Sequence, residues 1–342
     1  MKSNLTIVLL LKDRHEFNER FLNYYLKNNH NIYLLISDGS KKRLNKEFLN
    51  KIRKNKFIKY MKFPEDRSYN IFYKKIYKTL KIIKTKYFIL AANDDFFIFK
   101  TLLKCLDFLN KNRSKGYIGA GGTMLGFECS KNKKGLKEMG SFKNIYTYVK
   151  LDHKNKLKRF KSFIKSFSDL PRNCIMDRKV LMYIYKHSTN LFGNNIEFKD
   201  HFTNLFNIIM GRIKIFNTPL ILHETHSTSS EGNYRSKILL SVFQNKNFLD
   251  DLSKFDQILS KKLNSKKNYI INEYHNYVLS KMLDSLTLKN EPSIKQIKKI
   301  IFKKFQRKIL KKSLKKDEYI NKIKLDKNTI DTINLIENYI IN

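Results

Sequence analysis

The sequence contains no tryptophan and few of the residues that interrupt or cross-link a chain, with 4 prolines, 11 glycines and 3 cysteines in 342 residues. The cysteines are Cys105, Cys129 and Cys174, which lie far apart and form no C-x-x-C pair. They indicate neither a disulfide framework nor a zinc site, and they fit a reducing compartment. No apolar run approaches the roughly 18 residues needed to cross a bilayer, so the sequence predicts no membrane-spanning helix.

Acidic residues are also scarce: 30 Asp and Glu stand against 70 Lys and Arg, for a net charge of +40. Such a charge predicts attraction to nucleic acid, an anionic membrane surface or phosphorylated substrates. AT-rich codon usage, which favours Lys, Asn, Ile, Phe and Tyr, explains the same composition without any partner. The apolar fraction of 42% excludes wholesale disorder, and the length predicts one main domain with an appended region.

Short apolar runs alternate with helical patterns through the first quarter of the chain. The run at 5–11 is followed by Lys12-Asp13-Arg14 and by no small-residue cleavage site, so it predicts a buried strand and not a signal peptide. Further strands are predicted at 32–36, 57–61 and 87–92, with helices at 17–25, 44–53 and 69–83 between them. This order is typical of parallel βαβ units with right-handed crossovers.

The fourth apolar run, Tyr87 to Ala92, ends in Asn93-Asp94-Asp95. Ligands of open α/β sheets bind at the carboxyl edge of the strands. Two adjacent carboxylates repel each other unless a cation lies between them, so the pair predicts a site for a divalent metal ion and a diphosphate. An alternative stays open, in which one of the two aspartates caps a helix that begins near Thr101.

The middle of the chain is less regular. We expect a helix at 101–110, and then a Gly-rich strand at 117–122 whose backbone could approach a ligand closely. Residues 127–165 are polar and predict a long loop or flap. Helices are expected at 178–187 and 200–210, with a strand at 213–216.

The chain is predicted to be helical from about residue 234. Residues 295–316 carry 11 Lys and Arg and no acid, interleaved with apolar residues at helical spacing. This pattern is typical of a helix that lies on a membrane surface. A packed C-terminal helix with a solvated basic face fits it equally well.

Four pieces of the sequence, in this order, resemble the family-2 glycosyltransferases with the GT-A fold, over about residues 4–226. The opening strand is followed by Arg14-x-Glu16-Phe17, Ile36-Ser37-Asp38-Gly39-Ser40 is similar to the "DDGS" nucleotide turn, and Ala92-Asn93-Asp94-Asp95-Phe96 stands where the "DxD" metal motif belongs. The spacing of Asp200, Gly211 and His223 matches the family's acceptor-side acid, glycine and histidine.

The resemblance implies an α/β, Rossmann-like fold of the nucleotide-diphospho-sugar transferases, with a mostly parallel sheet flanked by helices. The GT-A domain would occupy residues 1–230, and residues 231–342 would form a basic helical extension. A Mg²⁺ or Mn²⁺ ion would bind Asp95 first, with Asp94 and His223 completing the site.

For the donor, the resemblance implies that Asp38 binds the nucleobase, that Asn93 lies near the ribose and that Asp94 assists either the metal or the ribose contact. An ordinary Asx turn is the alternative for Asp38. Arg67 and Lys74 could also contact the nucleotide.

On the acceptor side, inversion requires a base, for which we expect Asp200, with Glu197 one helical turn earlier as its rival. A helix N-cap or first-turn acid is the alternative for Asp200.

The sequence therefore predicts an inverting, metal-dependent hexosyltransferase that uses a nucleotide-sugar donor. It would act at the cytoplasmic face of the membrane on a surface-glycan or lipid-linked acceptor. Two alternatives stay open. One is a basic nucleic-acid-binding protein, although no recognised motif for nucleic acid is present and no nucleic acid is expected as a partner. The other is an inactive GT-A-like domain, because Asn93 and Lys199 stand where the family carries acids.

Overall fold

A computed structural model describes most of the α/β part of the chain and selected segments beyond it. The described residues are 3–28, 31–131, 137–166, 170–191, 196–226, 248–265, 270, 272–273, 314–316, 320 and 325–341.

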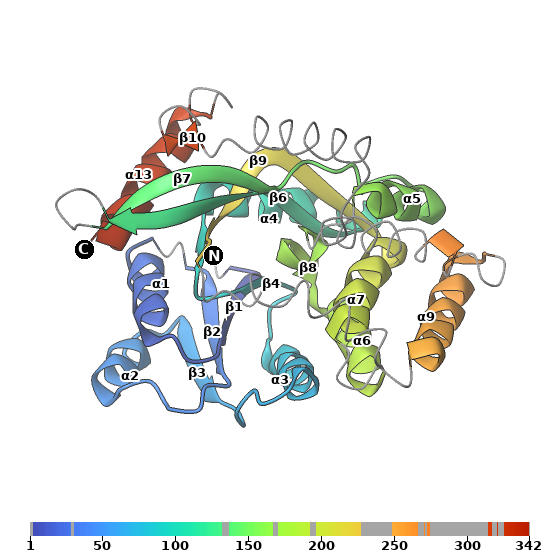
Figure 1. Ribbon diagram of the computed structural model, residues 1–342, viewed down its shortest axis with the longest axis horizontal. Coiled ribbons are helices and arrows are strands. Elements are labelled where there is room, and N and C mark those ends of the chain that lie inside the picture. The colour runs from blue at the N-terminus through green and yellow to red at the C-terminus, as the bar shows by residue number, and fades with distance from the viewer. Residues whose placement is uncertain are drawn as a thin grey trace, which may run out of the picture.

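The first four strands are parallel and form one half of the sheet (Figure 1). They are β1 (Leu5–Leu11), β2 (Tyr33–Asp38), β3 (Ile58–Lys62) and β4 (Tyr87–Ala91), and they lie in the order β4-β1-β2-β3. The crossovers are α1 (His15–Asn28), α2 (Lys46–Arg53) and α3 (Tyr69–Ile82). The βαβ alternation predicted from the sequence is confirmed.

Local chemistry determines where these helices begin. Asn45 caps α2 by accepting a hydrogen bond from the Phe48 amide at 2.7 Å, and Ser68 caps α3 by accepting one from the Ile71 amide at 3.3 Å. All residues of β4 are buried, as a strand covered on both faces requires. The carboxyl ends of the four strands therefore meet at one edge of the sheet.

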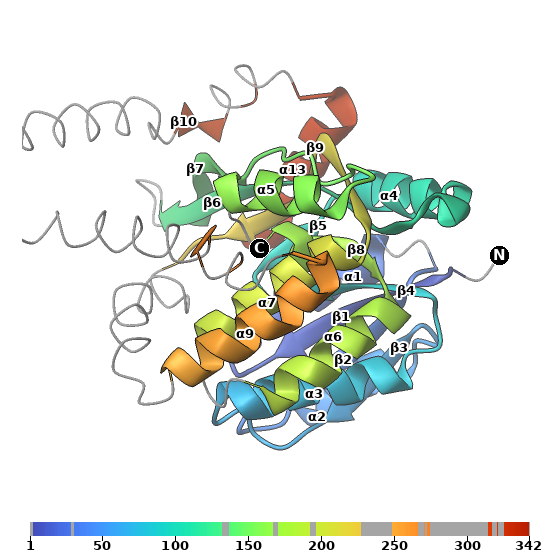
Figure 2. The ribbon, with the colours of Figure 1, turned by 90° about the vertical axis from the view of Figure 1, so that its right-hand side faces the viewer.

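The second half of the sheet is mixed (Figure 2). Its long strands are β6 (Tyr117–Lys131), β7 (Lys137–Tyr146) and β9 (Arg212–Glu224), and its short ones are β5 (Asp95–Phe97) and β8 (Ile175–Asp177). β8 runs antiparallel to both β4 and β6 and so joins the two halves. β6 is parallel to β9 and antiparallel to β7, while β5 is antiparallel to β9.

Helices accompany these strands as well: α4 (Phe99–Lys111), α5 (Lys156–Ser166), α6 (Arg178–Asn190) and α7 (Ile196–Met210). The helices and strands together confirm the predicted α/β fold class, with a Rossmann-like parallel sheet in the first half of the molecule.

The prediction of a loop over 127–165 is wrong. Residues 127–131 and 137–146 belong to the paired strands β6 and β7, and α5 follows at Lys156. Phe127 and Phe142 are fully buried, with their rings 6.2 Å apart. Because outward-facing positions of both strands are polar, among them Glu128, Lys143 and Asn144, the sequence conceals a half-buried antiparallel pair.

The Gly-rich start of β6 makes room for neighbouring strands, contrary to the prediction that it lets a ligand approach. A side chain at Gly121 would overlap the Cys174 thiol, and one at Gly122 would overlap the backbone oxygen of Thr218. These glycines allow close packing against the chain around β8 and β9.

The described part of the C-terminal region packs on the α/β part. Helix α9 (Phe248–Leu263) contacts α7, and α13 (Lys327–Ile341) contacts α1 and β7. The rings of Tyr24 and Tyr339 meet edge to face at 5.6 Å.

The predicted membrane-surface helix at 295–316 lies outside the described residues up to 313. At its end, Leu314–Lys315 form strand β10, which pairs with β7. This short strand differs from the predicted helix. None of the helices described is both long enough and apolar enough to cross a membrane.

Candidate active site

Strand pairing brings two predicted metal ligands together at the carboxyl edge of β4. The chain turns after β4 and enters β5, which pairs with β9 so that Asp95 lies opposite His223. His223 Nδ1 lies 2.8 Å from Asp95 Oδ1. The Glu224 amide donates to the Asp94 carbonyl at 2.9 Å, which ties the turn to β9.

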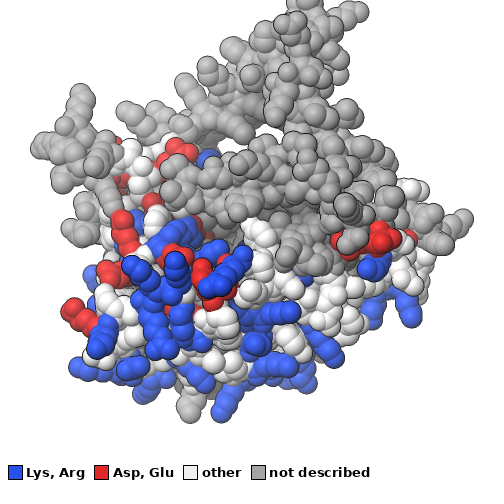
Figure 3. Space-filling model, turned by 60° about the horizontal axis from the view of Figure 1, so that its bottom comes forward, with Lys and Arg blue, Asp and Glu red and all other residues white. Residues whose placement is uncertain are grey.

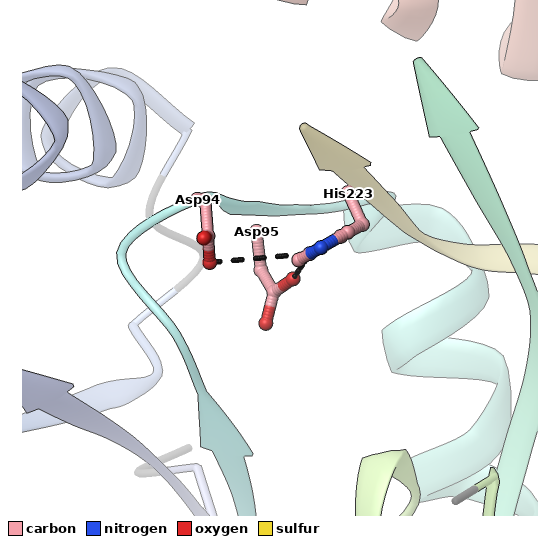
Figure 4. A group of neighbouring side chains, drawn as sticks. All are labelled: Asp94, Asp95 and His223. Carbon is pink, nitrogen blue, oxygen red and sulfur yellow. Dashed lines mark hydrogen bonds and ion pairs between the residues drawn. The ribbon is translucent and has the colours of Figure 1, made fainter. Parts of the chain in front are cut away.

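Asp94, Asp95 and His223 form a cluster that could hold a metal ion. One ligand atom of each lies within 4.8 Å of the others. Figure 4 shows the imidazole of His223 reaching from β9 toward the two carboxylates of the turn. Both aspartates are buried, whereas His223 is partly exposed. The two carboxylates therefore lie inside the protein, and the imidazole lies on the side of the cluster that is partly exposed to solvent.

The two carboxylate oxygens of Asp94 have different surroundings. Oδ2 accepts a hydrogen bond from Arg14 at 2.8 Å and lies 3.1 Å from His226 Nε2. Oδ1 is buried, has no hydrogen-bond partner among the residues that the structure describes, and lies 3.9 Å from His223 Nδ1. A buried carboxylate oxygen without a partner is costly, and a cation bound there would remove that cost.

The surroundings keep Asp94 ionised. Burial by itself would raise the pKa of Asp94, but the hydrogen bond with His226 and the nearby His223 and Arg14 outweigh burial and hold this pKa well below its usual range. An ionised carboxylate is the form that binds a metal ion.

The ligand types fit a divalent metal ion. Two carboxylates and one imidazole suit Mn²⁺, because this ion accepts nitrogen as well as oxygen ligands, whereas Mg²⁺ prefers oxygen alone. Asp95 is held in place by the Ala92 amide, which donates to its Oδ2 at 2.9 Å. That bond occupies Oδ2, whereas the other oxygen of Asp95, Oδ1, lies next to His223 in the cluster.

Asp38 ends β2, at the same edge of the sheet, but its carboxylate is fully buried. It accepts hydrogen bonds from the Ser40 amide at 2.8 Å and from the Tyr60 hydroxyl at 2.5 Å, with Lys62 3.8 Å away. The bond to Ser40 is the Asx turn of the alternative interpretation. A contact between Asp38 and a nucleobase stays a prediction.

Arg67 and Lys74 are both exposed, and Arg67 pairs with Glu65 at 2.9 Å. Close by, the buried pair Asp66 and Lys75 packs under Gly39, and Lys75 also donates to the Leu11 carbonyl at 3.1 Å. This buried pair joins the ends of β1 and β2 to the start of α3.

Asp200 accepts hydrogen bonds from Tyr73, in the second turn of α3, and from Arg172 at 3.2 Å. Because α3 begins beyond the carboxyl end of β3, these contacts place Asp200 toward the same edge of the sheet as Asp94. Asp200 is the fifth residue of α7, so it is not the N-cap. Glu197 lies one turn earlier on α7, and its side chain is outside the described part of the structure.

Lys199 is buried, and its Nζ lies 5.4 Å from the centre of the Tyr73 ring, whose hydroxyl contacts Asp200. Its Nζ donates to the carbonyls of Ser188 and Leu191, at 2.6 and 2.9 Å, at the carboxyl end of α6. Burial, assisted by the charge of Lys74, lowers the pKa of Lys199 to about 8. Lys199 therefore joins two helices, which accounts for a cation in this position.

No protein-family model matches the chain, and no curated protein matches it. Among solved structures, the chain is similar to the crystal structure of S. aureus TarS 1–349, with 13% identity, a TM-score of 0.47, and coverage of 85% of this chain and 76% of that one. The structure of TarS 1–349 in complex with UDP-GlcNAc gives 12% identity and a TM-score of 0.49 at the same coverage. The complex with UDP gives 14% and 0.45. The likeness concerns the fold alone.

Sequence reasoning missed Arg14 and His226 as parts of the cluster. Arg14 donates to Asn93 Oδ1 at 2.5 Å as well as to Asp94, and its Nη1 lies 3.0 Å from His226 Nε2. Asp13 and Arg14 both adopt left-handed backbone conformations, with φ of 56° and 58°. The order of the strands did indicate this contact: because β1 and β4 are parallel neighbours, the residues that follow them lie close together at one edge of the sheet.

Proposed function

We propose that the protein transfers a hexosyl group from a nucleotide-diphosphate donor to a hydroxyl acceptor, with inversion and with a divalent metal ion, as in family-2 glycosyltransferases. The observation that carries the proposal is the buried Asp94 Oδ1 without a partner, beside Asp95 and His223 at the carboxyl edge of the sheet. Anionic ligands with a bound cation are expected at this edge.

Asp94, Asp95 and His223 would hold Mn²⁺ or Mg²⁺. When bound, the ion would neutralise the charge that develops on the departing diphosphate. Arg14 and His226 would keep Asp94 ionised and oriented through Oδ2, so that Oδ1 faces the cluster.

Asp200 would accept the proton of the acceptor hydroxyl as that oxygen attacks the anomeric carbon from the side opposite the diphosphate. Tyr73 and Arg172 both contact Asp200 Oδ1 and would hold the carboxylate in one orientation. Glu197 remains the second candidate for the base. Lys199 would contribute by fixing α7 against α6.

The acceptor would be a surface glycan or a lipid-linked glycan, at the cytoplasmic face of the membrane. Residues 192–195, which precede α7, and 227–247, which follow His226 in the chain, lie outside the described residues. The acceptor is therefore proposed from the resemblance of the sequence motifs alone.

The test begins with a thermal-shift screen of nucleotide sugars with Mn²⁺, including UDP-GlcNAc, followed by donor hydrolysis and transfer assays. We expect Asp95→Ala to abolish activity and the Mn²⁺-dependent rise in Tm. Asp107→Ala is the control, because Asp107 is an exposed acid on α4 that pairs with Lys111 in its own helix.

Binding of the nucleotide sugar and Mn²⁺ without hydrolysis or transfer would favour the inactive GT-A-like domain. If neither binds, or if Asp95→Ala keeps full activity, the proposal is wrong.

A further inference from the structure

One face of the molecule concentrates exposed cations. Between residues 41 and 86, Glu47 is the only exposed acid, whereas fourteen lysines and arginines are exposed. We call this set the basic face; its cations are Lys41, Lys42, Arg43, Lys46, Lys51, Arg53, Lys54, Lys56, Lys59, Arg67, Lys74, Lys78, Lys81 and Lys84. The whole chain has 70 cations to 30 acids, so the ratio of cations to acids on this face is far higher than the composition alone would give.

The basic face covers α2, the edge strand β3 and α3, and α6 extends it. α6 packs against α3, contains no acid and exposes Lys179 and Lys186. In Figure 3, which looks toward this end of the molecule, blue side chains prevail across the lower part of the surface. Apart from Glu47 on α2, the exposed charged residues of these four elements are therefore all cations.

The other two acids within 41–86 are already paired. Asp66 forms a buried ion pair with Lys75, and Glu65 pairs with Arg67. Codon bias would spread cations over every face and leave acids among them. A lysine on an edge strand prevents unwanted strand pairing, which accounts for Lys59 but not for the cations of the helices.

The shape and chemistry of this face decide which polyanion it fits. Of the large apolar side chains exposed in the described structure, only Tyr183 of α6 lies on one of its elements. Other aromatic residues there, such as Phe57, Phe72 and Tyr77, are only partly exposed, so the described part of the face offers no row of fully exposed rings on which the bases of a single strand could stack. It is instead a broad surface in which β3 lies between α2 and α3 and α6 lies beside α3, with cations along each element (Figure 1).

We propose that the basic face docks the protein onto an anionic phospholipid bilayer. Each lysine or arginine close to such a surface contributes about 1 kcal/mol, or about fivefold in affinity, without any side chain entering the hydrocarbon. The attraction is screened by salt within a Debye length. This inference does not depend on the proposed transfer reaction.

The experiment is co-sedimentation of the full-length protein with vesicles of phosphatidylcholine, with and without phosphatidylglycerol, over a range of salt. The test variant replaces Arg53, Lys59, Lys78 and Lys84 by glutamine. Its control replaces Lys104, Lys111, Arg113 and Lys115, which are equally exposed and carry the same charge. These residues lie on and just after α4, away from α2 and α3 in Figures 1 and 2. If both variants have the Tm of the wild-type protein, their folding is unaffected.

We expect the wild-type protein to bind only the vesicles with phosphatidylglycerol, and the test variant, which lacks four cations, to bind them at least about tenfold more weakly. The control should bind like wild type. Equal losses in both variants, or no binding by wild type at low salt, would overturn the proposal.

A second arm offers a single-stranded oligonucleotide as competitor. If the protein prefers the oligonucleotide at equal phosphate concentration, and the test variant loses that preference, then the face binds nucleic acid and the membrane proposal is wrong.

Discussion

Two buried aspartates at the same edge of the sheet have opposite surroundings. Asp38, at the end of β2, uses both oxygens within the protein, on the Ser40 amide and the Tyr60 hydroxyl. Asp94, after β4, uses one oxygen on Arg14 and His226, and the other has no hydrogen-bond partner among the described residues. A buried carboxylate with complete partners stabilises the fold, whereas an incomplete one is a candidate ligand. The comparison therefore separates two motif aspartates that look alike in the sequence.

The largest effect is expected from Asp94→Asn. Because the neutral amide removes the charge that faces the cluster, transfer should fall by about 10²- to 10³-fold, as for other groups that stabilise developing charge. The Mn²⁺-dependent rise in Tm should disappear. Turnover and thermal shift of the same preparation measure both. An unchanged response to Mn²⁺ would remove Asp94 from the metal site.

Arg14→Gln should have an intermediate effect, because Arg14 acts on Asp94 Oδ2 and not on the reacting atoms. Loss of a residue that orients a metal ligand costs about 10- to 100-fold in metal affinity or activity. Titration with Mn²⁺ followed by calorimetry measures the affinity directly.

Arg20→Gln serves as the control, since Arg20 lies on α1, just after Arg14 in the chain, but pairs with Glu224. If Arg20→Gln weakens Mn²⁺ binding as much as Arg14→Gln does, the contact of Arg14 with Asp94 is not what supports metal binding.

Asp38→Asn should change stability and not metal binding. Replacing this buried carboxylate weakens two hydrogen bonds and removes the charge next to Lys62, so the free energy of unfolding should fall by about 1–3 kcal/mol. Tyr60→Phe, which deletes a single bond, should cost about 0.5–1.5 kcal/mol. Urea denaturation measures both variants.

The Mn²⁺-dependent rise in Tm should persist in Asp38→Asn and in Tyr60→Phe. A variant of Asp38 that folds as stably as wild type but no longer binds the nucleotide would give Asp38 the donor role predicted from the motif.

Sequence reasoning succeeds where the signal is local. The apolar runs of β1 to β4 and the helical spacing between them identify the parallel half, because burial on both faces demands continuous apolar residues. It fails over β6 and β7, where one polar face hides the strands. It also misses the contact of Arg14 with the cluster. Arg14 has a left-handed backbone conformation, and no glycine in the sequence indicates a turn there.

The order of elements and the chemistry at the end of β4 were determined by the sequence itself, since each depends on neighbours along the chain. The meeting of Asp95 with His223, 128 positions apart, was decided only by the pairing of β5 with β9. The same is true of the difference between Asp38 and Asp94. Hydrogen-bond partners that come from remote segments leave no trace in a local pattern, and they decide whether a buried carboxylate is satisfied or free to bind a cation.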